Sequence, residues 1–168
     1  RTAILLALTL VFQMMGRYLG PYNNFIVGPL VNAALLVSTA MAGLWSGAAI
    51  AIIAPFVSAL TNKAPIAPII LSFSPFIAAG NFILVFCFHL LIKKNRIVGV
   101  IVGSVLKSAF LFASITVFIN LLAGTMKIAP KIAASLTFLF GWPQLVTALI
   151  GGAVALIVIK ALGRNAEL

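Results

Sequence analysis

Long apolar runs alternate with short polar turns along the whole chain. A helix needs about 20 mostly apolar residues to cross the hydrocarbon core of a bilayer, and Gly, Pro and Asn mark the turns between such helices. The pattern therefore predicts six transmembrane helices, the last of them interrupted near Gly141-Trp142-Pro143. The predicted spans cover residues 2–19, 25–44, 48–60, 75–92, 97–122 and 136–162.

The connections between the spans follow from the same pattern. A tight hairpin is predicted at 43–47, and longer loops are predicted at 61–74 and 123–134. Six spans use most of the 168 residues, which leaves nothing over for a soluble catalytic domain. We expect an all-α integral membrane protein, with residues 1–168 forming a single transmembrane domain that is one compact bundle. No small-residue cleavage motif follows the first apolar run, so no removable signal peptide is expected.

The composition supports a membrane location. Hydrophobic residues make up 64% of the chain and charged residues only 7%, against about 25% charged residues in soluble domains. A net charge of +10 would suggest nucleic acid in a soluble protein. Here the basic residues lie between apolar runs, where they set topology and contact lipid headgroups. No nucleic-acid partner is therefore expected.

The basic residues also predict the orientation. With six spans both termini face the same side, and basic residues are enriched on the cytoplasmic side of membrane proteins. The terminal side would carry Arg1, Lys93, Lys94, Arg96, Lys160 and Arg164. The opposite side would carry Arg17, Lys63, Lys127 and Lys131. Both termini are therefore predicted to be cytoplasmic.

Acidic side chains are almost absent, which bears on the source of energy. Glu167 is the only one in the chain, whereas pumps and ion-coupled carriers use intramembrane Asp or Glu to bind a proton or cation. The sequence also lacks the Gly-x-x-x-x-Gly-Lys-Ser/Thr loop that binds nucleotide phosphates. A transported solute would therefore be driven by ATP hydrolysis in another protein.

Catalytic and metal chemistry are not expected. Cys87 and His89 are the only Cys and His of the chain, which excludes an internal disulfide and makes a poor metal site. Paired carboxylates, a His pair and a plausible Ser–His–Asp set are missing. We expect no enzyme activity, no bound metal and no intrinsic cofactor.

Carboxamides concentrate on the predicted outer side. Polar groups at membrane depth need partners or a water-filled cavity, so this set indicates a polar pocket open to the outside. The alternative is that the amides hold helices together and solvate the loops. The set comprises Gln13, Asn23, Asn24, Asn32, Asn62, Asn81, Asn120 and Gln144.

Lys107 is the most deeply placed charge. It lies near the middle of the fifth predicted span. No span contains an acid that could pair with it. It would hydrogen-bond backbone carbonyls or Asn and Ser side chains, become neutral, or face a partner protein. We do not expect it in the outer pocket.

Pairs of small residues four apart let helices approach closely. Such pairs occur at Ala3 and Ala7 in the first span and at Gly99 and Gly103 in the fifth. They indicate either packing inside the bundle or docking of another subunit.

The whole chain resembles the S components, which are the substrate-binding membrane subunits of energy-coupling factor (ECF) vitamin transporters. The resemblance rests on Ala3-Ile4-Leu5-Leu6-Ala7, Val27-Gly28-Pro29-Leu30-Val31-Asn32, Gly43-Leu44-Trp45-Ser46-Gly47 and Gly80-Asn81. It implies a multi-pass protein of a prokaryotic plasma membrane that binds a vitamin from outside. It also implies partners: a transmembrane coupling subunit, contacted through Ala3 and Ala7, and two cytoplasmic ATPase subunits that use ATP and Mg.

The resemblance also implies where the vitamin binds. Members of the family build the pocket from the outer loops and the outer ends of spans four to six. The residues of this chain that map to that region are Tyr22, Asn23, Asn24, Asn62, Lys63, Asn81, Asn120, Trp142 and Gln144.

The substrate is expected to be uncharged or weakly anionic. Thiamine, a cation, would need a carboxylate or an aromatic cage, and the pocket region has no carboxylate. An Asn-rich mouth suits a large ligand rimmed by amides, so cobalamin (vitamin B12) is the first expectation. Pantothenate, which would need a basic anchor, and a neutral vitamin B6-like or pyrimidine ligand are the next. The main alternative class is a stand-alone carrier or channel, which would need its own coupling site or a continuous polar pore.

Overall fold

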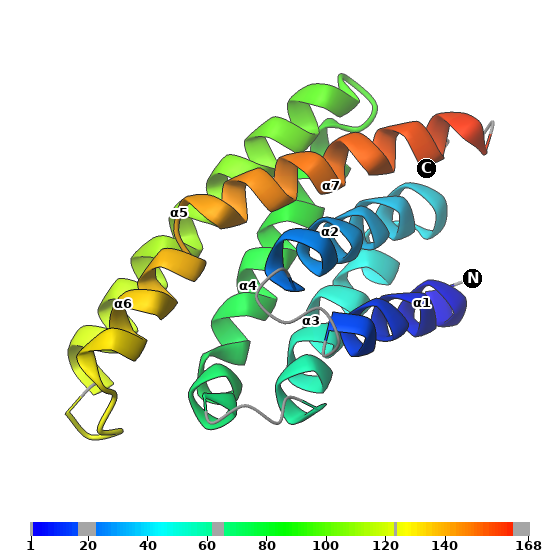
Figure 1. Cartoon of the computed structure of the whole chain (residues 1–168). Helices are drawn as coiled ribbons and strands as arrows, with labels where there is room; N and C mark the ends of the chain where they lie inside the picture. The colour runs from blue at the N-terminus through cyan, green and yellow to red at the C-terminus, as the bar shows by residue number, and fades with distance from the viewer. Residues whose placement is uncertain (1, 17–22, 62–65, 123, 163–168) are drawn as a thin grey trace.

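The structure is a computed structural model that describes residues 2–16, 23–61, 66–122 and 124–162. All regular secondary structure in these ranges is helical, as the sequence predicts (Figure 1). The helices are α1 (Thr2–Met15), α2 (Asn23–Ala42), α3 (Leu44–Thr61), α4 (Ala67–Leu91), α5 (Arg96–Leu122), α6 (Pro130–Leu139) and α7 (Trp142–Ala161).

Within the described ranges, four segments are long and apolar enough to cross a membrane: Phe25–Ala42, Ala67–Leu91, Arg96–Leu122 and Pro130–Ala161. The last segment comprises α6 and α7, so the interruption predicted near Gly141 is confirmed. The two other apolar helices, Thr2–Met15 and Leu44–Leu60, are shorter. The chain is a multi-pass membrane protein that is all-helical in its described ranges, and two of the predicted spans are short helices.

Three of the predicted boundaries are wrong. Helix α4 begins at Ala67 rather than at residue 75, and α6 begins at Pro130 rather than near residue 136. Pro68 and Pro130 lie in the first turns of these helices, where a proline removes no hydrogen bond of the helix. The predicted hairpin at 43–47 is a one-residue connection, because Gly43 adopts a φ of 86° and α3 begins directly after it.

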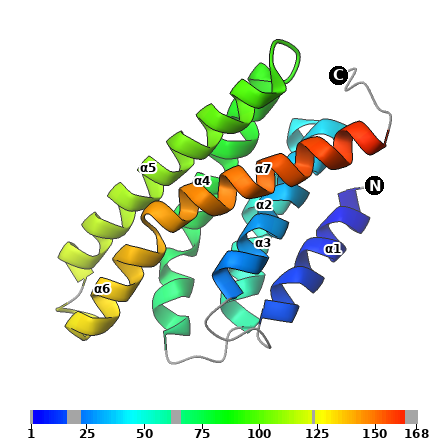
Figure 2. The same ribbon diagram turned by 45° about the horizontal axis from the view of Figure 1, so that its top comes forward.

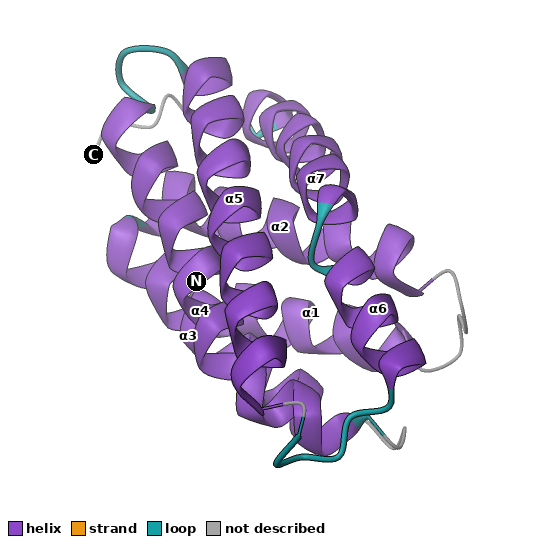
Figure 3. Ribbon diagram, turned by 90° about the vertical axis from the view of Figure 1, so that its left-hand side faces the viewer, coloured by secondary structure: helices purple, strands orange, loops and turns teal. Residues whose placement is uncertain are grey.

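Most helices pack against their neighbours in the chain, whereas α7 returns to pack against both α2 and α5 (Figure 1). Helix α1 lies at one edge of the bundle, against α2 and α3, and α5 lies at the opposite edge (Figure 2). The start of α1, the turn between α2 and α3 and the end of α7 lie at one end, called here the inner end after the predicted orientation (Figure 1). Helix α6 lies near the opposite, outer end, beside the outer half of α5 (Figure 3).

Glycines let these helices approach closely. A Cβ atom at Gly103 would lie 3.0 Å from the backbone oxygen of Leu84, so α5 and α4 touch through this glycine. A Cβ atom at Gly151 would lie 2.5 Å from the backbone oxygen of Pro29, which brings α7 directly onto α2. The small-residue pair of the fifth predicted span therefore serves packing inside the bundle.

Three apolar clusters fill the bundle: one joins α2, α3 and α4 around Leu35, Ile50 and Val85, and the other two lie one above the other. The inner core joins α2, α4, α5 and α7 and comprises Ala33, Leu36, Val37, Ala40, Leu84, Phe88, Ile92, Val100, Ala155 and Ile159. The outer aromatic core joins α4, α5 and α6 and comprises Phe73, Leu111, Ile115, Phe118, Leu136 and Phe140. The polar residues between these two clusters are the most unusual feature of the fold.

Candidate functional site

Part of the predicted pocket lies outside the described residues. Tyr22, Asn62 and Lys63 belong to this part. Asn23 and Asn24 form the start of α2, at the outer end, and only their backbone is described. The structure therefore places four of the nine predicted residues in detail: Asn81, Asn120, Trp142 and Gln144.

Two of these four residues mark the break between α6 and α7. The indole of Trp142 is 57% exposed and lies 5.7 Å from the ring of Phe138 and 6.4 Å from that of Phe25, measured between centroids. Gln144 donates a hydrogen bond from Nε2 to the backbone oxygen of Leu139 at 3.3 Å. The start of α7 thus lies beside the start of α2, where Asn23 and Asn24 precede Phe25.

The other two residues lie elsewhere. Asn120 is exposed near the outer end of α5. Asn81 is 5% exposed in the middle of α4. The structure consequently does not gather these four side chains around one cavity.

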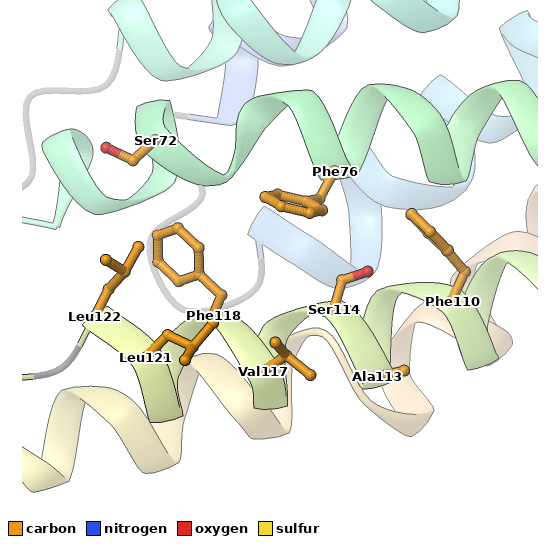
Figure 4. Close-up of a pocket in the computed structure, with 9 residues that line it drawn as sticks. All are labelled: Ser72, Phe76, Phe110, Ala113, Ser114, Val117, Phe118, Leu121 and Leu122. Carbon is orange, nitrogen blue, oxygen red and sulfur yellow. The ribbon is translucent and has the colours of Figure 1, made fainter.

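A groove of about 620 Å³ runs between the outer halves of α4 and α5 (Figure 4). None of the predicted pocket residues lines it. Its walls are mostly apolar, and Val117 and Leu121 on its rim are exposed, as expected for a surface in contact with lipid tails. The lining residues are Ser72, Phe76, Phe110, Ala113, Ser114, Val117, Phe118, Leu121 and Leu122.

A different polar site lies at the centre of the bundle. Lys107 on α5 and Asn32 on α2 are each 3% exposed. The ammonium nitrogen Nζ of Lys107 donates a hydrogen bond to Oδ1 of Asn32 at 2.6 Å. Of the roles left open for Lys107, hydrogen bonding to an Asn side chain is confirmed. A residue that faces a partner protein would be exposed in the isolated subunit, whereas Lys107 is buried.

Asn81 lies at the same level as this pair. Leu84 and Leu36 pack together in the inner core, and Asn81 and Asn32 lie one helical turn outward of them. On α5, Gly103 meets Leu84, and Lys107 lies one turn outward of Gly103. The two amides and the ammonium group therefore share one level of the membrane.

Two serines on the same stretch of α5 complete this level. Ser104 Oγ and Ser108 Oγ are buried, and neither has a hydrogen-bond partner among the described residues. We call Asn32, Asn81, Ser104, Lys107 and Ser108 the polar layer. It lies between the inner core and the outer aromatic core, and three of the four long membrane segments contribute to it.

Sequence reasoning missed this site for a physical reason. Lys107 stands out in the sequence because it is a charged residue deep in an apolar run. Its partner Asn32 is 75 residues away along the chain, and in the sequence it is one of several outer carboxamides. The packing of α4 and α7 against both α2 and α5 brings the two together.

The predicted coupling residues lie on the outward face of α1. Ala3 and Ala7 are exposed, as are Ile4 and Leu8 beside them. The opposite face is held to the bundle by hydroxyl groups, because Ser46 Oγ donates to Thr2 Oγ1 at 2.8 Å. Ser46 also shares a 2.6 Å hydrogen bond with Ser38, so α1, α2 and α3 are linked at the inner end. These bonds leave the Ala3 and Ala7 face free.

Comparison with known proteins gives one match. Neither a curated protein nor a solved structure matches the chain. Residues 1–163 match the family described as "ECF transporter, substrate-specific component", which is nearly the whole length. The chain therefore belongs to the substrate-specific components of ECF transporters.

Proposed function

We propose that the chain is the vitamin-binding subunit of an ATP-driven ECF uptake transporter in a prokaryotic plasma membrane. Family membership is the observation that carries this proposal, because a substrate-specific component is the subunit that holds the substrate. A transmembrane coupling subunit and two cytoplasmic ATPase subunits would supply the energy from ATP and Mg. The chain has no acid inside a predicted span, in keeping with energy supplied by partners.

The packing of the bundle supports a binding subunit over a stand-alone channel. A channel needs a continuous polar route. The inner core instead fills the space between α2, α4, α5 and α7 with side chains such as Leu84 and Phe88, both fully buried. A solute that entered from the outer end would stop at the polar layer.

Two parts of the site bear on the identity of the vitamin. Amide groups near the outer loops favour cobalamin, whose rim carries many amides. The buried ammonium group of Lys107 favours a smaller vitamin with an acidic group, such as pantothenate. A neutral vitamin B6-like or pyrimidine ligand would use the amides alone.

A thermal-shift screen of the purified chain against the water-soluble vitamins tests the proposal. A ligand present at 100 times its Kd stabilises the folded state by about 2.7 kcal/mol. For a chain of this size we expect the midpoint of unfolding to rise by roughly 5–10 °C. Cobalamin, pantothenate and pyridoxine are the first compounds to compare. If no vitamin raises the midpoint, the chain is not a vitamin-binding subunit.

A further inference from the structure

We propose that the polar layer is a carboxylate site, in which Lys107 receives the acidic group of a water-soluble vitamin. The inference rests on the proposed function and narrows it to one class of substrate. It places the acidic end of the ligand at the centre of the bundle, one level below the outer aromatic core.

The charge of Lys107 favours a carboxylate ligand. Lys107 is buried, and the sole acidic residue of the chain, Glu167, is one residue from the C-terminus. A buried ammonium group is costly unless an opposite charge neutralises it. Asn32 offers only the partial charge of an amide oxygen. An anion that neutralises the ammonium group would therefore come from another molecule, and one small enough to enter between the helices.

The polar layer has more hydrogen-bond donors than acceptors. An ammonium group carries three N–H donors, and a serine hydroxyl and an asparagine amide also donate. Among the described residues, Asn32 is the hydrogen-bond acceptor of the Lys107 ammonium group, and Ser104 Oγ and Ser108 Oγ are without partners. An ionised carboxylate is purely an acceptor, with two oxygens that take several hydrogen bonds. A carboxylate can therefore accept the hydrogen bonds that these donors offer.

The buried position of Lys107 also favours it over the other lysines as the ligand's partner. Lys127 and Lys131 near the outer end are exposed, and an exposed charge gains little from pairing because water and salt screen it. Lys107 lies between two apolar clusters, where the same pairing is stronger. The inner core closes the layer from the inner end, so the ligand would reach it from the outer end by displacing rings of the outer aromatic core.

The test compares acids with their uncharged analogues. Pantothenate is paired with panthenol, nicotinate with nicotinamide, and biotin with biotin amide, and the affinity of each for the purified chain in lipid nanodiscs is measured by calorimetry. We expect at least one acid to bind. Its uncharged analogue should bind about 10- to 100-fold more weakly, as expected for the loss of a buried charged hydrogen bond.

Two variants assign that difference to the polar layer. Lys107→Met should weaken binding of the acid by a similar factor and should leave the affinity for the analogue nearly unchanged. Lys160→Met, the same change at an exposed position at the inner end of α7, is the matched control and should leave both affinities unchanged. Asn32→Asp places a carboxylate of the protein beside Lys107, so it should weaken binding of the acid to the same extent as Lys107→Met. This second variant provides the test if Lys107→Met does not fold.

The outcomes separate the two proposals. If a vitamin binds but its affinity is unchanged by Lys107→Met and by Asn32→Asp, the carboxylate site is wrong and the proposed function stands. The carboxylate site is also wrong, and the proposed function again stands, if the only vitamin that binds is uncharged. If no vitamin of either kind binds to the wild-type chain, the proposed function fails and the carboxylate site fails with it.

Discussion

At the scale of single residues, two adjacent glycines of α7 decide how closely three helices meet. A Cβ atom at Gly151 would fall against Pro29 and Asn32 of α2, and one at Gly152 would fall against Val100 of α5. At Gly151 a larger residue would require the backbone of α2 to move, and at Gly152 it would require the Val100 side chain to move. The polar layer depends on this approach, because it holds Asn32 at the level of Lys107.

Gly151→Ala should therefore destabilise the protein. The added methyl group would lie 2.5 Å from the Pro29 oxygen and 2.7 Å from Cβ of Asn32. We expect a cost of about 1–3 kcal/mol, seen as a fall in the unfolding midpoint of roughly 2–12 °C. Gly124→Ala is the control, since a Cβ atom there has no neighbour within 4 Å. An equal midpoint for Gly151→Ala and the wild type would show that the α2–α7 contact is looser than described.

At the scale of helices, one ring holds the outer half of the bundle together. Phe73 on α4 is 1% exposed. Its ring centroid lies 5.3 Å from that of Phe118 on α5 and 4.9 Å from that of Phe140, which follows α6, both in edge-to-face geometry. Three elements thus meet at one side chain, and tilted aromatic pairs of this kind add to the stability gained from burial.

Phe73→Ala should lower stability more than Phe76→Ala. Removal of a buried phenyl ring costs about 3–5 kcal/mol. Phe76 stacks on Phe73 at 5.2 Å but is 39% exposed, so its removal leaves a smaller cavity. Chemical or thermal unfolding of the two variants in the same detergent measures the difference. Equal losses would mean that the rings contribute through their surface area and not through the cavity that they fill.

The same scale shows what could be predicted from the sequence. The apolar runs predict the helices, including the break near Gly141, because the span length and the turn residues are local properties. Helices α4 and α6 begin earlier than the pattern predicts, since a proline is typical of loops although it also fits the first turn of a helix. The polar layer is harder to predict from the sequence, because the Lys107–Asn32 contact depends on how helices distant in the chain pack.

At the scale of the whole molecule, one edge of the bundle exposes the small-residue pair Ala3 and Ala7. Helix α1 is fixed through Thr2 and Ser46 on one side, while Ala3 and Ala7 remain exposed on the other. Small residues four apart on an exposed helix permit close approach of a second helix. Its place at the edge of the bundle, away from α5, keeps it separate from the polar layer (Figure 2).

Ala7→Trp should abolish vitamin uptake while leaving vitamin binding by the isolated subunit intact. The bulky ring would hold the helix of the coupling subunit away from α1 without touching the ligand. Uptake is measured in proteoliposomes that contain the coupling and ATPase subunits, and Ala3→Trp should behave in the same way. Ala113→Trp, at an exposed position in the α4–α5 groove, is the control. Normal uptake by both α1 variants would remove the coupling role from this face.

The glycine pair of α7 also limits how the molecule can move. Since α2 and α5 both rest on this one point, a displacement of α7 there must carry both helices with it or break a tight contact with one of them. Helix α6, on the other side of the break at Gly141, takes no part in these two contacts.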